Sequence, residues 1–390
     1  MRIAKIEDLH CDAGWRVWSF LKITTDDGVV GWSEYNESYG SQGLSGVIRK
    51  LAECLIGMDP RPVERITAML HALTRQAPGG LIQQAIAALE NALVDLKARA
   101  LGVPVAELLN GPVRDRLRLY WSHCGSYRLS HAEAMGKPPV RSLDDLRALA
   151  RMVREEGFSA LKTNIFCFDR GAPYMHQPGF ARNAGWPELN VDRRILGIID
   201  DQMAAFRDGA GAEIDLLLDL NFNFKTEGYL EVARTIERYD LMWLEIDSYD
   251  PQALALIRSA ARTPIASCES LFGRRQFRPF LDARAVDVAI VDVPWNGILE
   301  SMKIAAMCET YEVNCAPHNF YGHLSTMMSA HFCAAIPNFR IMEIDIDDVP
   351  WKDEVVSPPA IEAGQLVLPD APGWGTEVNE AAIRAHPPKG

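Results

Sequence analysis

The sequence predicts an α/β protein: a (β/α)8-type (modified TIM) barrel with an α+β capping domain. Short apolar runs alternate with amphipathic helical segments through most of the 390 residues, which is typical of consecutive βα units. Six polar side chains recur in or just after these runs at steps of 26, 24, 23, 26 and 25 residues, about one strand, one helix and two loops. A doubly wound nucleotide-binding sheet is disfavoured because no GxGxxG follows the first strand. The six side chains are Asp219, Glu245, Glu269, Asp292, His318 and Glu343.

Residues 1–115 are expected to form the α+β capping domain. Apolar and polar residues alternate in residues 1–10 and 16–35, and Asp26-Asp27-Gly28 supplies a turn between two strands. A meander of strands followed by helices is therefore expected before the barrel. Helical periodicity is present in residues 45–56, 64–73 and 81–100.

Residues 116–357 are expected to form the barrel, and residues 358–390 a tail that returns to the capping domain. The loop of residues 167–187 is rich in Gly, Pro and aromatic residues, which favours an ordered functional loop over a linker. The eight candidate strands lie in LRLYWS, SALKTNIF, IDLLLDLN, LMWLEID, PIASCES, VDVAIVDV, EVNCAPHN and FRIMEID.

Composition narrows the class of protein. Hydrophobic residues make up 48% and charged residues 24%, which suits a globular protein with an ample core. The net charge of -12 disfavours nucleic acid and anionic membranes as partners, because that field repels phosphate. The start, MRIAKIEDLH, lacks the apolar core of a secretion signal, so a cytoplasmic protein is expected. The eight cysteines show no metal-ligand spacing and are expected to be buried free thiols.

Three carboxylates of the recurring set point to a metal site. Asp219, Glu245 and Glu269 fall at successive strand ends, which meet at one mouth of a parallel barrel. Acidic residues after strands also cap helices, but three like charges at one mouth are costly without a cation. Oxygen ligands of this kind suit Mg2+.

Two further pairs of residues suggest proton chemistry. Asp292 and His318 fall on neighbouring strands, where the carboxylate can hold one imidazole nitrogen and leave the other as a general base. His323 and His331 are interpreted as bystanders. Lys162 and Asn164 lie two apart on a strand and share a face, so both can point into the barrel. The lysine would stabilise a developing oxyanion, but the amide of Asn164 cannot remove a carbon-bound proton.

Several fragments together resemble the enolase superfamily, and specifically its mandelate racemase subgroup with the acid-sugar dehydratases. The resemblance covers nearly the whole chain and implies the barrel with its capping domain. It implies Mg2+ at Asp219, Glu245 and Glu269, and a catalytic dyad of Asp292 and His318. Glu343 matches the carboxyl group beside the substrate carboxylate, and Lys162 the first lysine of a Lys-x-Lys motif. The fragments are ALKTN, LLLDLN, WLEID, IASCES, VDVAIVDV, APHN and IMEID.

The chain departs from that family pattern at Asn164, where racemases of the subgroup carry the second lysine. Some dehydratases, galactonate dehydratase among them, resemble this chain in having Lys-x-Asn. We therefore expect a lyase of sugar-acid catabolism: a Mg2+-dependent dehydratase of an aldonate or aldarate, in which His318 removes the α-proton and Lys162 with a protonated Glu343 stabilises the enediolate. The product would be a 2-keto-3-deoxy acid.

Two alternatives stay open. A racemase, epimerase or lactone cycloisomerase of a 2-hydroxy acid would use the same scaffold, with Lys162 or a loop residue as the second base. A non-catalytic sugar-acid binder would not need the Asp–His pair. The family resemblance also suggests a homo-oligomer.

The distal end of the substrate has weaker candidates. In the family, loops of the capping domain close over the barrel mouth. Trp15 and Arg16, and Tyr39 in the segment ESYGSQG, are therefore candidate contacts for the distal end of the substrate. Arg16 could receive a second substrate carboxylate. His318 itself or a separate acid would protonate the leaving hydroxyl, and His123, Tyr174 and His176 are weaker candidates for that acid. Asn221 is a further predicted contact of the substrate.

Overall fold

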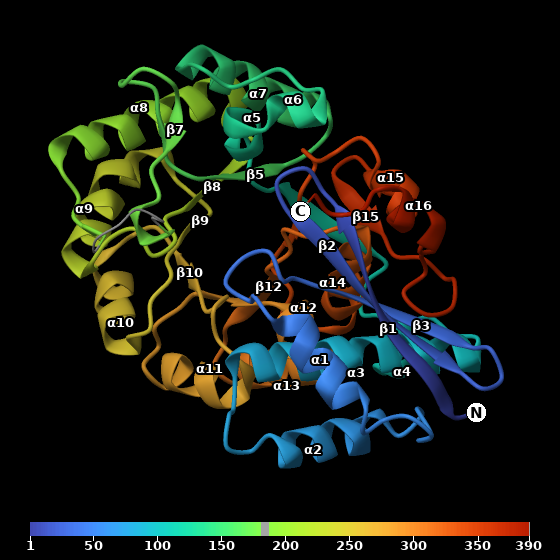
Figure 1. Cartoon of the computed structure of the whole chain (residues 1–390). Helices are drawn as coiled ribbons and strands as arrows, with labels where there is room; N and C mark the ends of the chain where they lie inside the picture. Colours follow the sequence, from blue (N-terminus) through green and yellow to red (C-terminus); the bar gives the residue numbers. More distant parts are fainter. Residues whose placement is uncertain (181–186, 390) are drawn as a thin grey trace.

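The computed structural model describes residues 1–180 and 187–389, and within them eight parallel strands form a barrel (Figure 1). They pair in chain order, and β13 returns to pair with β4. A parallel bridge between Cys315 and Phe339 links β12 to the segment before β13. The predicted barrel is thereby confirmed. The strands are β4 (Arg116–Trp121), β5 (Ala160–Thr163), β8 (Asp215–Asp219), β9 (Trp243–Glu245), β10 (Ile265–Ser267), β11 (Val288–Val291), β12 (Asn314–Pro317) and β13 (Met342–Ile344).

Helices between the strands cover the outside of the barrel (Figure 1). In the first of them, buried residues recur at the three- and four-residue spacing of an amphipathic helix, and the Ser142 side chain caps its first turn by accepting from the Asp145 amide. It packs tightly against α8, because a Cβ on Gly209 would lie 2.3 Å from the Arg147 carbonyl oxygen. The helices are α7 (Leu143–Glu155), α8 (Arg193–Ala210), α9 (Thr226–Ile236), η2 (Glu237–Tyr239), α10 (Pro251–Ala260), α11 (Gly273–Asp282), α12 (Val293–Asn296), α13 (Ile298–Thr310) and α14 (His323–Ala335). A further helix, α15 (Lys352–Val355), follows the last barrel strand.

The N-terminal segment forms the antiparallel sheet β1–β2–β3 and a layer of helices beside the barrel (Figure 1). The longest helix, α3, packs against β3 and α12, which explains why it is buried on nearly all sides. A Cβ on Gly31 would lie 2.3 Å from the Ala92 carbonyl oxygen, so β3 and α3 approach closely. The elements are β1 (Ile3–Asp12), β2 (Val17–Thr25), β3 (Val30–Tyr35), α1 (Leu44–Ala52), α2 (Val63–Leu73), α3 (Gly80–Leu101) and α4 (Val105–Leu108).

The C-terminal tail contacts both parts of the chain. The hairpin of β14 (Ile361–Glu362) and β15 (Gln365–Val367) adds to the start of β4 in antiparallel fashion. Beyond it, Trp374 donates through Nε1 to the Trp32 carbonyl oxygen at 2.8 Å, and α16 (Glu380–Ala385) packs on β1. The tail therefore joins the barrel as well as the N-terminal sheet.

Short elements surround the barrel mouth. They are α5 (Ser126–Ser130), α6 (Ala132–Met135), β6 (Phe166–Cys167), β7 (Tyr174–Met175) and η1 (Pro178–Phe180). Within the long loop of residues 167–187, β7 pairs with β6, while residues 181–186 lie outside the described residues. None of the described helices combines the length and the hydrophobicity of a membrane-spanning segment.

The inside of the barrel is filled by a separate cluster of apolar side chains drawn from its strands. The rings of Tyr120 on β4 and Trp243 on β9 meet edge to face at 5.7 Å, although these strands are not neighbours. The members of this cluster are the inward-facing residues of the barrel strands and of the residues next to them. The cluster comprises Tyr120, Ala160, Leu217, Met242, Trp243, Ala266, Val288, Ile290, Ala316 and Ile341.

Candidate active site

Lys162 and five of the six recurring polar residues lie one layer above the apolar cluster that fills the barrel. Each follows an inward-facing apolar residue by two positions, and residues two apart in a strand point to the same side. Glu269 breaks this rule, since Cys268 has a φ of 91° and turns the chain directly after β10. The residues that obey it are Lys162, Asp219, Glu245, Asp292, His318 and Glu343.

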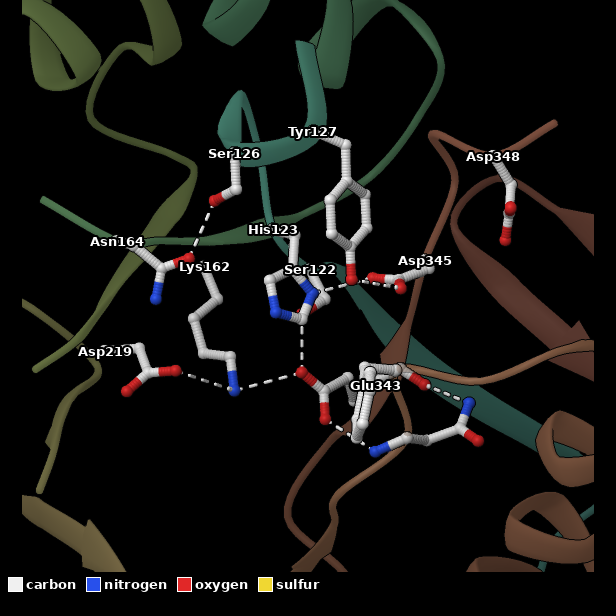
Figure 2. A network of polar contacts seen from close by, with 12 residues as sticks. Ser122, His123, Ser126, Tyr127, Lys162, Asn164, Asp219, Glu343, Asp345 and Asp348 are labelled. Atoms are coloured by element: carbon white, nitrogen blue, oxygen red, sulfur yellow. Dashed lines mark hydrogen bonds and ion pairs between the residues drawn. The ribbon is translucent and has the colours of Figure 1, made fainter. Parts of the chain in front are cut away.

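Lys162 lies among the acidic residues of this layer. Its Nζ is 3.0 Å from Oε1 of Glu245, 3.0 Å from Oε1 of Glu343 and 4.0 Å from Oδ2 of Asp219. Burial alone would lower the pKa of Lys162, but Glu245 and Glu343 outweigh it and hold that pKa well above its usual value. Lys162 is therefore a fixed ammonium (Figure 2).

Glu343 is surrounded by hydrogen-bond donors. Its carboxylate accepts from the Ser122 hydroxyl and, at 2.6 Å, from the Asn319 amide. Burial would raise the pKa of Glu343, but Lys162, His318 and His123 outweigh it and bring the pKa down to about 2. These surroundings favour the ionised form of Glu343, which can only accept hydrogen bonds, whereas the role expected from the family resemblance needs the protonated form.

His318 and Asp292 form the predicted pair. Nδ1 of His318 lies 2.6 Å from Oδ2 of Asp292, which is fully buried. Asp292 also accepts from the Tyr321 hydroxyl and the Trp295 amide, at 2.5 and 2.7 Å. Burial would lower the pKa of His318, but Glu269 and Asp292 outweigh it and raise the pKa to about 10. The Nε2 edge of the imidazole is the one left for chemistry.

The three predicted cation ligands are carboxylates whose charges act on one another; Asp219 and Glu245 are buried and Glu269 is half-buried. Burial raises the pKa of Asp219, Glu245 and Glu269, and the three act on one another through repulsion. Glu245 accepts from Lys162 and from Nε1 of Trp243. Among residues 1–180 and 187–389, no three Asp, Glu, His or Cys side chains form a complete coordination shell.

Asp247 strengthens the case for a cation at this place. It is 3% exposed, and neither carboxylate oxygen has a hydrogen-bond partner. Burial, with Glu269 and Asp219 close by, holds the pKa of Asp247 well above its usual value. A donor set of buried, mutually repelling carboxylates with two unpartnered oxygens fits a hard divalent cation such as Mg2+.

Asn164 occupies the position where a second lysine would stand. Its Oδ1 accepts from the Ser126 hydroxyl at 2.7 Å, and its Nδ2 donates to Oδ1 of Asn221 at 3.5 Å. Asn221, at a φ of 45°, in turn donates its backbone and side-chain amides to Asp219. The amides of Asn164 and Asn221 thus orient one predicted cation ligand.

Arg16 is predicted to receive a second substrate carboxylate, but its guanidinium already has partners within the protein. Its guanidinium is buried and pairs with Asp345 at 3.2 Å and Asp348 at 2.6 Å, and it also donates to the Phe320 carbonyl oxygen. Its charge is therefore already neutralised within the protein, and a second substrate carboxylate would have to displace these partners.

The other residues predicted to contact the substrate lie in three different places: beside Arg16, in the long loop, and at the barrel mouth. Trp15 lies in the turn that carries Arg16 and stacks on His131 at 5.0 Å. The Tyr39 hydroxyl, from the loop between β3 and α1, donates to the Trp15 carbonyl oxygen at 3.4 Å. His176 stacks on Phe224, and the charges acting on it are Arg194 and Asp192, not the carboxylates of the mouth. Tyr174 accepts from Arg194. His123 lies at the mouth and pairs with Asp345.

Four site residues escaped the sequence reasoning. Asp247 shares a strand face with Glu245, so two-residue periodicity could have found it. Tyr321 and Asn319 lie within three residues of His318 in PHNFY, but nothing in the sequence distinguishes them from loop residues. Ser122 meets Glu343 across 221 positions of the chain, which no local pattern signals.

Comparisons with known proteins show the family to which the chain belongs. The enolase C-terminal domain-like family matches residues 145–382, and the N-terminal domain of the mandelate racemase / muconate lactonizing enzyme family matches residues 15–110. The chain is 28% identical to D-xylonate dehydratase of Haloferax volcanii, over 95% of this chain and 85% of that protein. It is 29% identical to D-galactonate dehydratase of Ralstonia nicotianae, over 94% and 90%.

A solved structure from Burkholderia xenovorans strain LB400 is more similar. That protein, described as a candidate L-alanine-DL-glutamate epimerase, is 51% identical, with a TM-score of 0.98 over 100% of this chain and 99% of its own. A second structure of it, bound to magnesium and fumarate, gives a TM-score of 0.97 over 100% and 96%. The chain therefore belongs to the enolase superfamily, in the mandelate racemase subgroup, and resembles the acid-sugar dehydratases of that subgroup.

Proposed function

We propose that this protein is a dehydratase of a sugar acid, either an aldonate or an aldarate. The observation that carries the proposal is the asymmetry of the mouth. His318 is backed by a buried carboxylate at 2.6 Å, whereas the corresponding place just after β5 holds the amide of Asn164. One base suffices for elimination of water, but inversion at the α-carbon needs an acid or base on each face.

The residues of the chain divide the work as follows. Nε2 of His318 removes the α-proton, and Asp292 fixes the orientation of the imidazole. The Lys162 ammonium faces the negative charge that develops on the substrate carboxylate. Glu343 accepts from Lys162 and holds it in place. Magnesium, which the family implies, would be held by Asp219, Glu245 and Glu269 and would supply Lewis-acidic charge beside the substrate carboxylate.

The elimination ends in a 2-keto-3-deoxy acid. As the bond from the β-carbon to its hydroxyl breaks, the electron pair of the enediolate forms the new carbon–carbon double bond. The resulting enol gains a proton at the β-carbon and becomes the ketone. Water is the only other product.

Epimerisation is the second candidate, because the Burkholderia xenovorans protein is described as a candidate L-alanine-DL-glutamate epimerase. Lys162 would then be the second acid or base. Its ammonium is held by Glu245 and Glu343, which raise its pKa and oppose loss of the proton. This charge state favours dehydration over epimerisation.

One incubation distinguishes the two candidates. The protein with Mg2+ is mixed in D2O with a panel of mono- and diacid sugars, and 2-keto acid and α-deuterium are both measured. A dehydratase yields keto acid from at least one compound. Labelled substrate of inverted configuration without keto acid would replace dehydration by epimerisation.

A further inference from the structure

A second His–Asp pair stands at the same mouth. Nδ1 of His123, just after β4, lies 2.9 Å from Oδ1 of Asp345, just after β13. The Asp345 side chain is fully buried, while the His123 side chain is 21% exposed. This layout repeats that of Asp292 and His318, where a buried carboxylate also supports a more accessible imidazole.

Asp345 is held as an anion. Besides His123, its carboxylate accepts from the Tyr127 hydroxyl at 3.0 Å and from Arg16 at 3.2 Å. Burial would raise the pKa of Asp345, but His123, Arg16 and Lys352 outweigh it and lower that pKa. An ionised carboxylate only accepts hydrogen bonds, so Nδ1 of His123 carries the hydrogen. The Nε2 nitrogen is left for another partner.

The backbone of His123 is also unusual. Its φ is 45°, in the left-handed region that side chains other than glycine rarely adopt. Stacking of its ring on Tyr127, with centroids 4.8 Å apart, keeps the imidazole in place. Residues held in such conformations gather at functional sites.

His123 belongs to the same polar layer as the proposed base. Its charge acts on both Glu343 and Asp219, and Ser122 contacts both the His123 ring and Glu343. The ring of Phe320 lies 5.0 Å from that of His318 and 6.3 Å from that of His123. Figure 2 shows the His123 ring beside Lys162 and Glu343.

We propose that His123, paired with Asp345, is the catalytic acid that protonates the leaving hydroxyl. The inference rests on the proposed dehydration and adds to it a second proton-transferring residue. Of the other two candidates for this acid, His176 responds to charges outside the mouth, and the hydroxyl of Tyr174, in the long loop, is engaged by Arg194.

Over one turnover, each proton that leaves a residue is replaced, so both histidines return to their starting protonation states. His318 takes the α-proton, and the imidazolium of His123 gives its Nε2 proton to the β-hydroxyl as that carbon–oxygen bond breaks, which releases water. His318 then returns its proton to the β-carbon, while the proton of the enol hydroxyl restores His123. Nothing is oxidised or reduced, and no co-reactant is needed.

The test uses the acid sugar that yields keto acid in the panel, together with its 3-deoxy-3-fluoro analogue. Fluoride leaves without a proton, so an acid for the hydroxyl is not needed for that analogue. In His123→Asn, which tolerates the left-handed backbone, dehydration should fall at least about 100-fold. Fluoride release and α-deuterium exchange should stay within about threefold. The matched control is His10→Asn, which removes the imidazole that pairs with Asp8 in the N-terminal sheet.

Each outcome decides one point. Dehydration within about threefold of wild type in His123→Asn would overturn the inference and leave His318 to serve as both base and acid. An equal loss of dehydration and fluoride release would also overturn it, because that pattern marks a structural role. No keto acid from the wild-type protein with any acid sugar would overturn the proposed function itself.

Discussion

Nε2 of His318 lies 3.6 Å from Oε2 of Glu269, so the proposed base and a proposed cation ligand contact each other directly. Glu269 is the largest of the influences that raise the pKa of His318 to about 10. A divalent cation on Glu269 would offset that negative charge and favour the neutral imidazole that abstraction of a proton requires. The proposed chemistry therefore calls for positive charge beside Glu269, in addition to the Lys162 ammonium that already pairs with Glu245 and Glu343.

Asp247→Asn tests that conclusion through stability. Burial opposes the ionisation of Asp247, so folding must either keep its proton or bury its charge, and Asn removes that cost. The substitution should raise the unfolding midpoint in EDTA by about 2 °C or more and shrink the gain that Mg2+ gives. Thermal unfolding with EDTA and with Mg2+ measures both effects. The exposed Asp240→Asn serves as the control and should change neither value. An unchanged midpoint of Asp247→Asn in EDTA would count against the crowding of charge.

Tyr321→Phe tests the support of the dyad. The substitution keeps the ring that packs on Phe320 but removes the hydroxyl that donates to Asp292 at 2.5 Å. Loss of a hydrogen bond to a charged group costs about 1.5–3 kcal/mol, which corresponds to a decrease in kcat/KM of roughly 10- to 100-fold.

Steady-state kinetics of Tyr321→Phe on the acid sugar found in the panel gives the answer. Tyr311→Phe, which removes an exposed hydroxyl paired with Asp282, is the matched control and should keep wild-type kcat/KM. Equal kcat/KM for Tyr321→Phe and wild type would show that Asp292 needs no such support.

Glu90→Gln tests a contact between α3 and the barrel. Oε1 of Glu90 accepts from the Leu299 amide at 2.9 Å, and burial raises the pKa of Glu90 to about 8 from 4.5. Between these pH values the folded state holds a proton that the unfolded state has lost, so this group makes the protein less stable as pH rises from about 4.5 to 8. Gln keeps the acceptor without the titration.

Urea unfolding at pH 5 and at pH 8 measures the effect. The wild-type protein should lose more stability over this interval than Glu90→Gln, by a few kcal/mol. The exposed Glu309→Gln is the control and should follow the wild type. Parallel pH dependence of Glu90→Gln and wild type would show that Glu90 ionises normally.

The sequence was sufficient for the barrel and for the layer of polar residues, because both follow from local periodicity. A two-residue strand repeat places Lys162, Asp219 and Glu245 on one side, and a βα repeat brings successive strand ends together. Contacts between residues far apart in the chain could not be predicted from local sequence patterns. Arg16 meets Asp345 and Asp348 across more than 300 positions of the chain. The groups around Glu343 that keep it ionised come from the ends of three other strands, β4, β5 and β12.

Loss of α-proton exchange in His318→Asn tests the central claim most directly. Wild-type protein and variant are incubated with Mg2+ and the identified acid sugar in D2O, and deuterium at the α-carbon and 2-keto acid are measured. We predict that the variant gives neither, while Mg2+ still raises its unfolding midpoint as it does in the wild type. Continued exchange and turnover by His318→Asn would contradict the assignment of this imidazole as the base.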